Sequence, residues 1–294
     1  MARLPTHGIH TALITPFTAD DQVDIAAFEA LCQRQLDGGI HGLVPCGTTG
    51  ETPTLTDAEQ DAVNAAAIRV AGGKVPITVG IGSNSTRQTL ANAERAAKVG
   101  ADAGLLVFPY YNKPNPKGLI AHVQAVSSVG LPLVLYHVPG RTAHHLPVEL
   151  LAELANLPGV IAVKEATGDV RYGTDLVSKT DRAVLSGDDF TFLGLLAQGS
   201  HGCISVVSNV DPAGTVAVYE HFAAGRGPEA AAALARMWEL IGYLFAEVNP
   251  VPVKAAVAAL GWCRPDLRLP LAGSSFPPPT ELLRRMELDF RGAE

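Results

Sequence analysis

Eight short apolar runs, separated by segments of helical periodicity, constrain the fold of this chain more than any other feature. They lie at Ile9–Thr15, Gly42–Cys46, Ile77–Ile81, Gly104–Phe108, Leu133–His137, Val160–Lys164, Ala183–Ser186 and Gly202–Val206. Short runs without polar alternation are typical of strands buried on both faces of a parallel sheet. Eight alternating β and α units in residues 1–225 predict a (β/α)8 TIM barrel, which fits this spacing better than an open doubly wound sheet.

Signals for helix starts lie between these runs. Asp24–Asp37 puts apolar side chains on one face and ends before Gly38-Gly39. Thr56–Glu59 and Ser85–Gln88 each have the sequence of a capping box. Each signal predicts a helix that follows one of the strands.

The pattern changes after the eighth run. An Ala-rich helix is predicted over Pro228–Glu247, and another over Pro252–Leu260 after a proline-containing break. No linker or low-complexity segment separates these helices from the preceding part of the chain. We therefore expect a barrel domain at 1–225 and a C-terminal helical extension at 226–294 that packs on it.

The composition argues against several kinds of partner. The 294 residues carry a net charge of -7 without a basic block, which disfavours nucleic acid and anionic membrane surfaces. No apolar stretch reaches membrane-spanning length, and Met1–His10 lacks the apolar core of a signal peptide. The cysteines form no CxxC pair and indicate reduced, buried side chains. We expect a cytoplasmic protein with no nucleic-acid or membrane partner.

Polar and aromatic residues gather where the runs end, and in a barrel these ends meet at one rim. The segments are GTTGE at 47–51, PYYN at 109–112, YHVPGRT at 136–142, KE at 164–165 and GDD at 187–189. Catalytic residues of barrel enzymes lie at this rim. The clustering therefore predicts an active site.

Lys164 is the strongest candidate in this set. It ends an apolar strand and shares its inward face with the small residues Val160 and Ala162. Burial beside apolar residues lowers the pKa of a lysine and leaves a nucleophilic amine. The alternative is a side chain that extends from the strand end into solvent.

Tyr136 occupies the matching position on the preceding strand. Because neighbouring strands are about 4.8 Å apart, its hydroxyl is within reach of an adduct on the Lys164 nitrogen. A Schiff-base mechanism needs this combination of an uncharged amine and an acid/base group. The pair favours a catalytic Lys164 over the solvated alternative.

For each of three other polar segments, two interpretations remain open. The loop Gly47–Gly50 either binds a carboxylate through its backbone NH groups or is an ordinary βα turn. Arg141 either binds a carboxylate or is solvated. Asp188-Asp189 forms a carboxylate pair or, as its neighbours suggest, caps a helix. Lys254, in the extension, is expected to reach solvent, and the histidine spacing predicts no metal ligand.

The rim motifs occur in the order found in a known family. The chain resembles the dihydrodipicolinate synthase / N-acetylneuraminate lyase family of class I, Schiff-base aldolases, from ALITPF at 12–17 through the rim segments and VKEATG at 163–168 to NPVPVK at 249–254. The resemblance covers nearly the whole chain. It implies a TIM-barrel lyase that makes a carbon–carbon bond and needs neither a metal nor an organic cofactor.

The resemblance also implies catalytic roles. Lys164 forms an imine with pyruvate, Tyr136 is the main acid/base group, and Thr48 relays protons. Tyr111, the second tyrosine of PYYN, completes this relay across a subunit interface. That role implies a homo-oligomer, either a dimer or a tetramer.

Further residues are implied in substrate binding. Thr49 holds the pyruvate carboxylate, Ile204 lines the pyruvate pocket, and we add Gly187 from the end of the seventh run. Arg141 stands where the branch that condenses pyruvate with L-aspartate 4-semialdehyde, on the route to diaminopimelate and lysine, holds the carboxylate of the aldehyde. The alternative is a sister aldolase acting on a keto-deoxy sugar acid or on N-acetylneuraminate, which usually lacks this arginine.

Two departures from the family pattern carry predictions. His137 stands where asparagine is more usual, and we expect it to border the site. Lysine-inhibited members have two histidines in the segment that reads here Glu51–Gln60, and Gln88 replaces a glutamate expected nearby, although Asn84 and Tyr110 remain. We therefore predict weak or absent inhibition by lysine.

Overall fold

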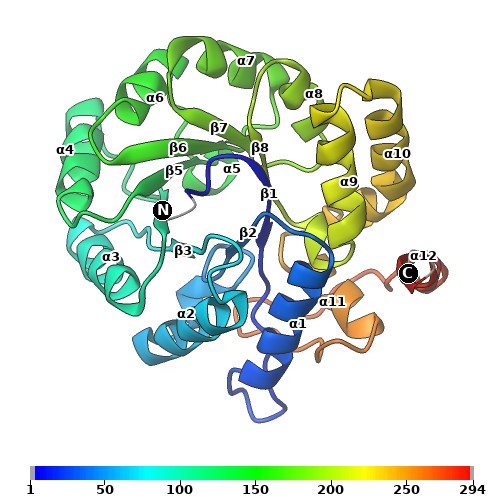
Figure 1. The fold of residues 1–294 in the computed structure, drawn as a ribbon. Coiled ribbons are helices and arrows are strands. Elements are labelled where there is room, and N and C mark those ends of the chain that lie inside the picture. Colours follow the sequence, from blue (N-terminus) through cyan, green and yellow to red (C-terminus); the bar gives the residue numbers. More distant parts are fainter. Residues whose placement is uncertain (1–3, 292–294) are drawn as a thin grey trace.

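The eight predicted strands form the barrel at the centre of the computed structural model, which describes residues 4–291 (Figure 1). They are β1 (Gly8–Ala12), β2 (Gly42–Val44), β3 (Thr78–Gly80), β4 (Ala103–Val107), β5 (Leu133–His137), β6 (Val160–Glu165), β7 (Ala183–Ser186) and β8 (Gly202–Ser205). All pairings are parallel, in the order β2-β1-β8-β7-β6-β5-β4-β3. A parallel bridge between Leu43 and Ile77 joins the two ends of this order. The predicted TIM barrel is confirmed.

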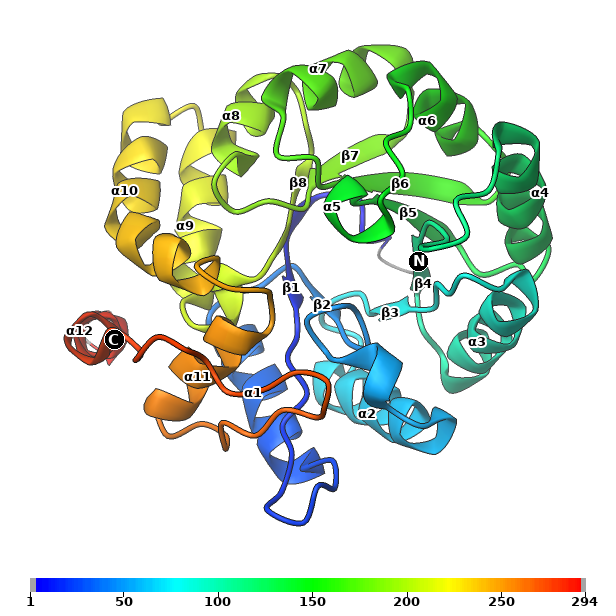
Figure 2. The same ribbon diagram turned by 180° about the vertical axis from the view of Figure 1, so that it is seen from behind.

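Helices surround the strands, as alternating βα units require. The outer helices are α1 (Ile25–Asp37), α2 (Asp57–Ala71), α3 (Thr86–Val99), α4 (Pro116–Ser127), α6 (Val148–Ala155), α7 (Val170–Lys179), α8 (Phe192–Ala197) and α9 (Pro212–Ala223). Single-turn elements follow three strands, namely η1 (Thr52–Thr54), α5 (Pro139–Thr142) and η2 (Val207–Asn209). Figure 2 shows the barrel from the side at which the strands end, with α5 in front of it.

Side-chain caps fix where several helices begin. Asp24 accepts a hydrogen bond from the Ala27 backbone at 2.9 Å, and Thr56 and Glu59 form the complete capping box that the sequence predicts. Ser85 accepts from the backbone of Gln88 at 3.4 Å, but the Gln88 amide donates to Asn92. The second predicted box is therefore only half formed.

Strand alternation divides the apolar core into two parts. Inward-facing residues fill the barrel interior and are mostly small or branched: Ala12, Val44, Ala103, Leu105, Val134, Tyr136, Val138, Ala162, Ala183, Leu185 and Ile204. A larger cluster fills the space between strands and helices. Because β6 contributes Ala162 to the interior, Lys164, two residues further on, also points inward.

The C-terminal segment packs on one side of the barrel. It contains α10 (Gly227–Leu244), α11 (Val251–Ala259) and α12 (Thr280–Arg291), and α10 contacts α9. Both ribbon views show α11 beside α1 (Figures 1 and 2), and the guanidinium of Arg34 on α1 lies 3.7 Å from the centre of the Trp262 ring just after α11. This arrangement brings the end of α10 and the start of α11 to the rim of the barrel.

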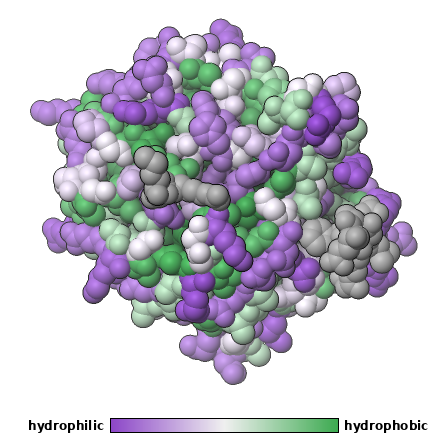
Figure 3. Space-filling model, in the orientation of Figure 1, coloured by the Kyte–Doolittle hydropathy of each residue, from purple (hydrophilic) through white to green (hydrophobic). Residues whose placement is uncertain are grey.

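The surface is mixed in character. Hydrophilic side chains occupy most of the edge of the face in Figure 3, with apolar residues between them. None of the helices in residues 4–291 is long and apolar enough to span a membrane. Within the same residues, no group of three or more His, Cys, Asp or Glu side chains is arranged to hold a metal ion.

Candidate active site

Lys164 and Tyr136 lie side by side on the inner wall of the barrel. The register of β5 and β6 pairs the two residues, as predicted, and Lys164 Nζ lies 4.3 Å from the centre of the Tyr136 ring. Both residues are nearly covered, with 5% and 6% of their surface exposed. None of the ion pairs formed within residues 4–291 includes Lys164. The solvated alternative for Lys164 is therefore wrong.

Gly187 makes room for the lysine side chain. A Cβ atom at this position would lie 2.8 Å from Lys164 Cε and 2.7 Å from Ala166 Cβ, closer than such atoms approach one another. Only glycine leaves the path of the Lys164 side chain free without displacing its neighbours. Gly187 thus controls where the amine lies.

The amine opens into a cavity of about 180 Å³ at the rim. Its polar lining comes from the ends of four strands and from the C-terminal segment: Thr48, Thr49, Tyr136, Arg141, Lys164, Asp188 and Asn249. Apolar walls are provided by residues such as Leu105, Val206 and Phe245. A small, largely apolar cavity with a few convergent polar groups is the usual form of a site for a small molecule.

Thr49 is fixed by the C-terminal segment. The Asn249 side-chain amide donates a hydrogen bond of 2.9 Å to Thr49 Oγ1, and Thr49 is buried. Two residues later, Glu51 is also buried and accepts from Lys254 Nζ and from the Arg268 backbone NH. The 47–51 loop is therefore held from outside the barrel by residues of the C-terminal segment.

Lys254 does not reach solvent, so that prediction was wrong. Its side chain is fully buried, pairs with Glu51 and lies with Nζ 4.0 Å from the centre of the Phe17 ring. Burial lowers the pKa of Lys254, and the charge of Glu51 opposes this change. A charge is buried here because a partner charge and a ring face replace its water.

Arg141 stands at the mouth of the cavity. Its Nη2 donates a hydrogen bond of 2.8 Å to the backbone oxygen of Asn249, so the same residue orients both Thr49 and Arg141. The remaining guanidinium donors are available to an anion. This arrangement favours the carboxylate-binding interpretation over a freely solvated arginine.

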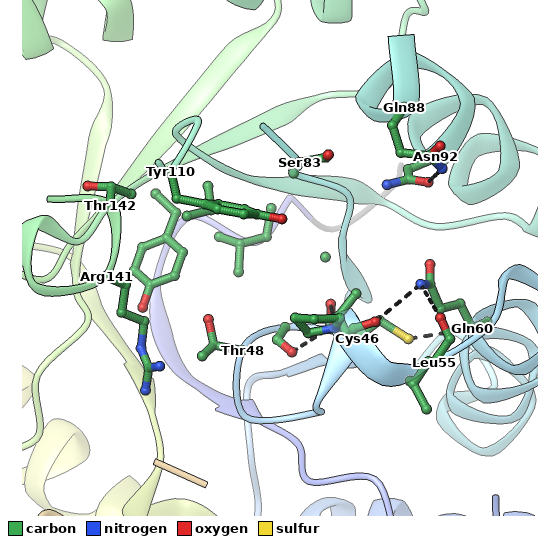
Figure 4. Close-up of a pocket in the computed structure, with 18 of the residues that line it drawn as sticks. Cys46, Thr48, Leu55, Gln60, Ser83, Gln88, Asn92, Tyr110, Arg141 and Thr142 are labelled. Atoms are coloured by element: carbon green, nitrogen blue, oxygen red, sulfur yellow. Dashed lines mark hydrogen bonds between the residues drawn. The ribbon is translucent and has the colours of Figure 1, made fainter. Parts of the chain in front are cut away.

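A larger cleft of about 500 Å³ adjoins the cavity and shares Thr48, Tyr136 and Arg141 with it. Figure 4 shows Arg141 and Thr48 at one end of this cleft and Gln88 and Asn92 at the other. Its one lining carboxylate among the described residues, Asp57, pairs with Arg95 at 2.7 Å. The cleft therefore offers mainly neutral polar groups to a ligand.

Three other residues from the sequence analysis lie elsewhere. Ile204 is buried in the barrel interior below the cavity and is not part of its lining. Tyr111 is 90% exposed, outside both cavities, with a backbone φ of 73°. His137 does not border the site, contrary to our expectation, because strand alternation turns its side chain to the opposite face from Tyr136.

His137 faces the helix layer, where it is almost fully buried. Its ring packs 6.2 Å from Phe108 and 5.6 Å from Tyr172, measured between ring centres. Neither ring nitrogen has a hydrogen-bond partner within the described residues. Burial, together with the neighbouring His145 and His144, lowers the pKa of His137 to about 4. It is a neutral packing residue at neutral pH.

Several lining residues were not predicted as site residues from sequence, among them Asp188, Phe245 and Asn249. Asp188 was interpreted as a helix cap, and Phe245 and Asn249 were assigned only to the extension. Asn249 belongs to the NPVPVK motif, so a place near the site could have been inferred for it from the sequence. No such motif includes Phe245, and its position depends on how α10 packs against the barrel.

Comparisons with known proteins agree with this site. A family model described as the dihydrodipicolinate synthetase family matches residues 5–281. The 4-hydroxy-tetrahydrodipicolinate synthase of Sorangium cellulosum is 47% identical over 276 residues, which cover 92% of each chain. The dihydrodipicolinate synthase structure from Thermotoga maritima has a TM-score of 0.91 at 37% identity, covering 97% of this chain and 98% of that one. The chloride-inhibited Acinetobacter baumannii enzyme, solved with pyruvate, has a TM-score of 0.90 at 37% identity, with 98% and 97% covered.

The chain belongs to the dihydrodipicolinate synthetase family, because the family model matches it over most of its length. Its TIM barrel, with a lysine and a tyrosine that point inward at the rim, agrees with this assignment. It is an enzyme of the lyase class. Its activity is that of a 4-hydroxy-tetrahydrodipicolinate synthase, consistent across relatives at 41–47% identity over about 90% of the chain.

Proposed function

We propose that this site condenses pyruvate with L-aspartate 4-semialdehyde through an imine on Lys164. The amine attacks the keto carbon of pyruvate, and the carbonyl oxygen leaves as water. The observation that carries the proposal is the position of Lys164 Nζ, which lies 4.3 Å from the centre of the Tyr136 ring on the wall of the 180 Å³ cavity. The related A. baumannii enzyme was solved in complex with pyruvate.

The proton transfers are assigned to hydroxyl groups that line the cavity. Tyr136 exchanges protons with the carbinolamine and then helps to remove a methyl proton of the bound pyruvate, which gives the enamine. Thr48, on the adjoining loop, relays these protons. Thr49 and the backbone NH groups of its loop bind the pyruvate carboxylate, and the hydrogen bond from Asn249 keeps Thr49 in place.

The second half of the reaction joins the two substrates. The enamine carbon attacks the aldehyde carbon, and the aldehyde oxygen becomes the hydroxyl group of the product. Arg141 holds the carboxylate of the aldehyde by a charge-assisted hydrogen bond. The α-ammonium group of the substrate then loses a proton, and its nitrogen attacks the imine carbon to close the ring. The bond between that carbon and Lys164 Nζ breaks as the lysine nitrogen takes up a proton. This sequence yields 4-hydroxy-tetrahydrodipicolinate.

Reduction with borohydride in the presence of pyruvate tests the imine. Peptide mass mapping is expected to find the pyruvyl increment on the peptide that contains Lys164, and to lose it in Lys164→Ala. Lys179→Met is the control, since it removes an exposed lysine that pairs with Glu149 on the outer helices and should still trap pyruvate on Lys164. An increment on any other lysine would contradict the mechanism.

A second copy of the chain completes the proposed site. Tyr111 belongs to the relay by resemblance, yet it is exposed and outside the cavity of its own chain. We assign it to the relay of a neighbouring subunit, which makes the active enzyme a homo-oligomer.

A further inference from the structure

Asp188 is the one carboxylate among the described residues that line the 180 Å³ cavity. It follows β7, whereas Arg141 follows β5, and β6 with Lys164 lies between these two strands. Strands two apart are separated by about 10 Å, twice the usual spacing. A negative and a positive side chain therefore flank the amine at which the reaction occurs.

Only one of the two oxygens of the Asp188 carboxylate takes part in hydrogen bonds of the fold. Oδ1 accepts hydrogen bonds from the Phe190 and Thr191 backbone NH groups at 2.9 and 3.0 Å, and from the Thr191 hydroxyl at 3.1 Å. Oδ2 makes no hydrogen bond or ion pair within residues 4–291. An asparagine or a serine would close the same turn, so the turn does not explain the charge.

A second acceptor lies on the same cavity. Asn249 Oδ1 is buried and has no hydrogen-bond partner within the described residues, although the side-chain nitrogen of Asn249 is used by Thr49. A buried acceptor left without a donor costs free energy. A ligand that brings N–H donors into the cavity would remove this cost.

We propose that Asp188 Oδ2 and Asn249 Oδ1 form a subsite for the α-ammonium group of the aldehyde substrate, beside the carboxylate site at Arg141. The inference rests on the proposed function and names what selects an amino aldehyde over one that lacks the amine. An α-amino acid presents a cation and an anion on one carbon, and the cavity presents the complementary pair. Pyruvate has no ammonium group, so imine formation does not depend on this subsite.

The test compares two aldehydes that differ only in the amine. L-aspartate 4-semialdehyde serves as substrate and succinate semialdehyde as a competitive inhibitor, in wild type and in Asp188→Asn. Asparagine retains the turn acceptor but loses the anionic oxygen. We expect kcat/KM for aspartate semialdehyde to fall about tenfold to a hundredfold, the range of one charged hydrogen bond. The inhibition constant of succinate semialdehyde and the KM of pyruvate should change by less than about twofold.

Two further variants control for the turn. Asp188→Ser also keeps a turn acceptor and should reproduce the selective loss. Asp169→Asn changes a matched carboxylate that accepts from the Arg171 and Tyr172 backbone outside the cavity, and should change none of the constants. Equal weakening of both aldehydes, or no effect on aspartate semialdehyde, would overturn the subsite.

Borohydride trapping distinguishes failure of the ammonium subsite from failure of the proposed function. A pyruvyl adduct on Lys164 together with unchanged aldehyde selectivity in Asp188→Asn rejects the ammonium subsite alone. Absence of the adduct in the wild-type enzyme rejects the proposed function, and the subsite with it.

Discussion

Gly187 leaves the room that the Lys164 side chain occupies, and so it fixes the position of the amine to which we assign imine formation. We predict that Gly187→Ala lowers kcat/KM by about a hundredfold, the effect expected when a catalytic group is displaced by about 1 Å. The added methyl group would meet Lys164 Cε at 2.8 Å. Steady-state kinetics and the yield of the borohydride-trapped adduct measure the change.

The control for this substitution is Gly140→Ala on the same rim. A Cβ atom there has no heavy atom within 4 Å, so activity should stay close to that of the wild type. Thermal unfolding of both variants separates displacement of the amine from loss of the fold. Full activity in Gly187→Ala would show that the Lys164 side chain does not need this path.

His137 illustrates a residue-scale effect on stability. Its pKa is lowered to about 4 in the folded state, mainly by burial, whereas an unfolded histidine titrates near 6.5. Between these values the unfolded chain binds the additional proton, so the free energy of unfolding falls as the pH falls from about 6.5 to about 4. One such histidine accounts for a loss of about 2 kcal/mol between pH 7 and pH 5.

We predict that His137→Asn reduces this pH-dependent loss by about 2 kcal/mol, because asparagine does not titrate. Urea denaturation at pH 7 and pH 5 provides the two free energies. His221→Asn, at a partly exposed histidine on α9, should leave the difference between the two pH values as in the wild type. An unchanged pH dependence in His137→Asn would mean that the ring is protonated in the folded protein.

At the scale of elements, the buried pair of Glu51 and Lys254 joins α11 to the loop at 47–51. We predict that Lys254→Met destabilises the protein by about 3–5 kcal/mol, because it leaves the Glu51 charge buried without its main partner. The KM for pyruvate should rise as well, since Thr49 lies on the same loop. Replacing both charges, as Glu51→Gln with Lys254→Met, should recover part of the stability. A double variant less stable than Lys254→Met would contradict this account.

The elements of the barrel could be predicted because each strand carries its own signal. Val160–Lys164 is apolar and short, and the structure only extends it to Glu165. Strand alternation likewise placed Tyr136 and Lys164 on one face from local sequence alone. The same alternation, applied to His137, would have directed it away from the site.

Long-range partners could not be predicted in this way. Lys254 has the sequence context of an exposed helix residue, and its partner Glu51 lies 203 positions earlier in the chain. The contribution of Phe245 and Asn249 to the cavity depends on how two helices pack after the barrel is complete. The charge of Asp188 looked like a cap because one of its oxygens does close a turn.

At the scale of the whole molecule, the cleft of about 500 Å³ bears on regulation. Lysine carries two ammonium groups, and Asp57, the one carboxylate among the described lining residues, is already paired with Arg95. Gln60 and Gln88 add only neutral groups. We predict weak or absent inhibition by L-lysine in initial-rate assays. Half-inhibition at micromolar lysine would contradict this prediction.

The last prediction concerns how subunits assemble. Tyr111 is 90% exposed, so its side chain packs little against its own chain, and its backbone φ of 73° is one that a tyrosine rarely adopts. If it acts in the site of a neighbour, Tyr111→Phe should lower kcat by at least about a hundredfold, as expected for loss of a proton-transfer group. A mixed dimer that pairs one Tyr111→Phe chain with one Lys164→Ala chain can be isolated with two different tags. It should regain about half of the wild-type activity, because one of its two sites combines an intact Lys164 with the intact tyrosine of the other chain. If Tyr111 served its own chain, both sites of that dimer would lack a catalytic group, and the dimer would be as inactive as its parents.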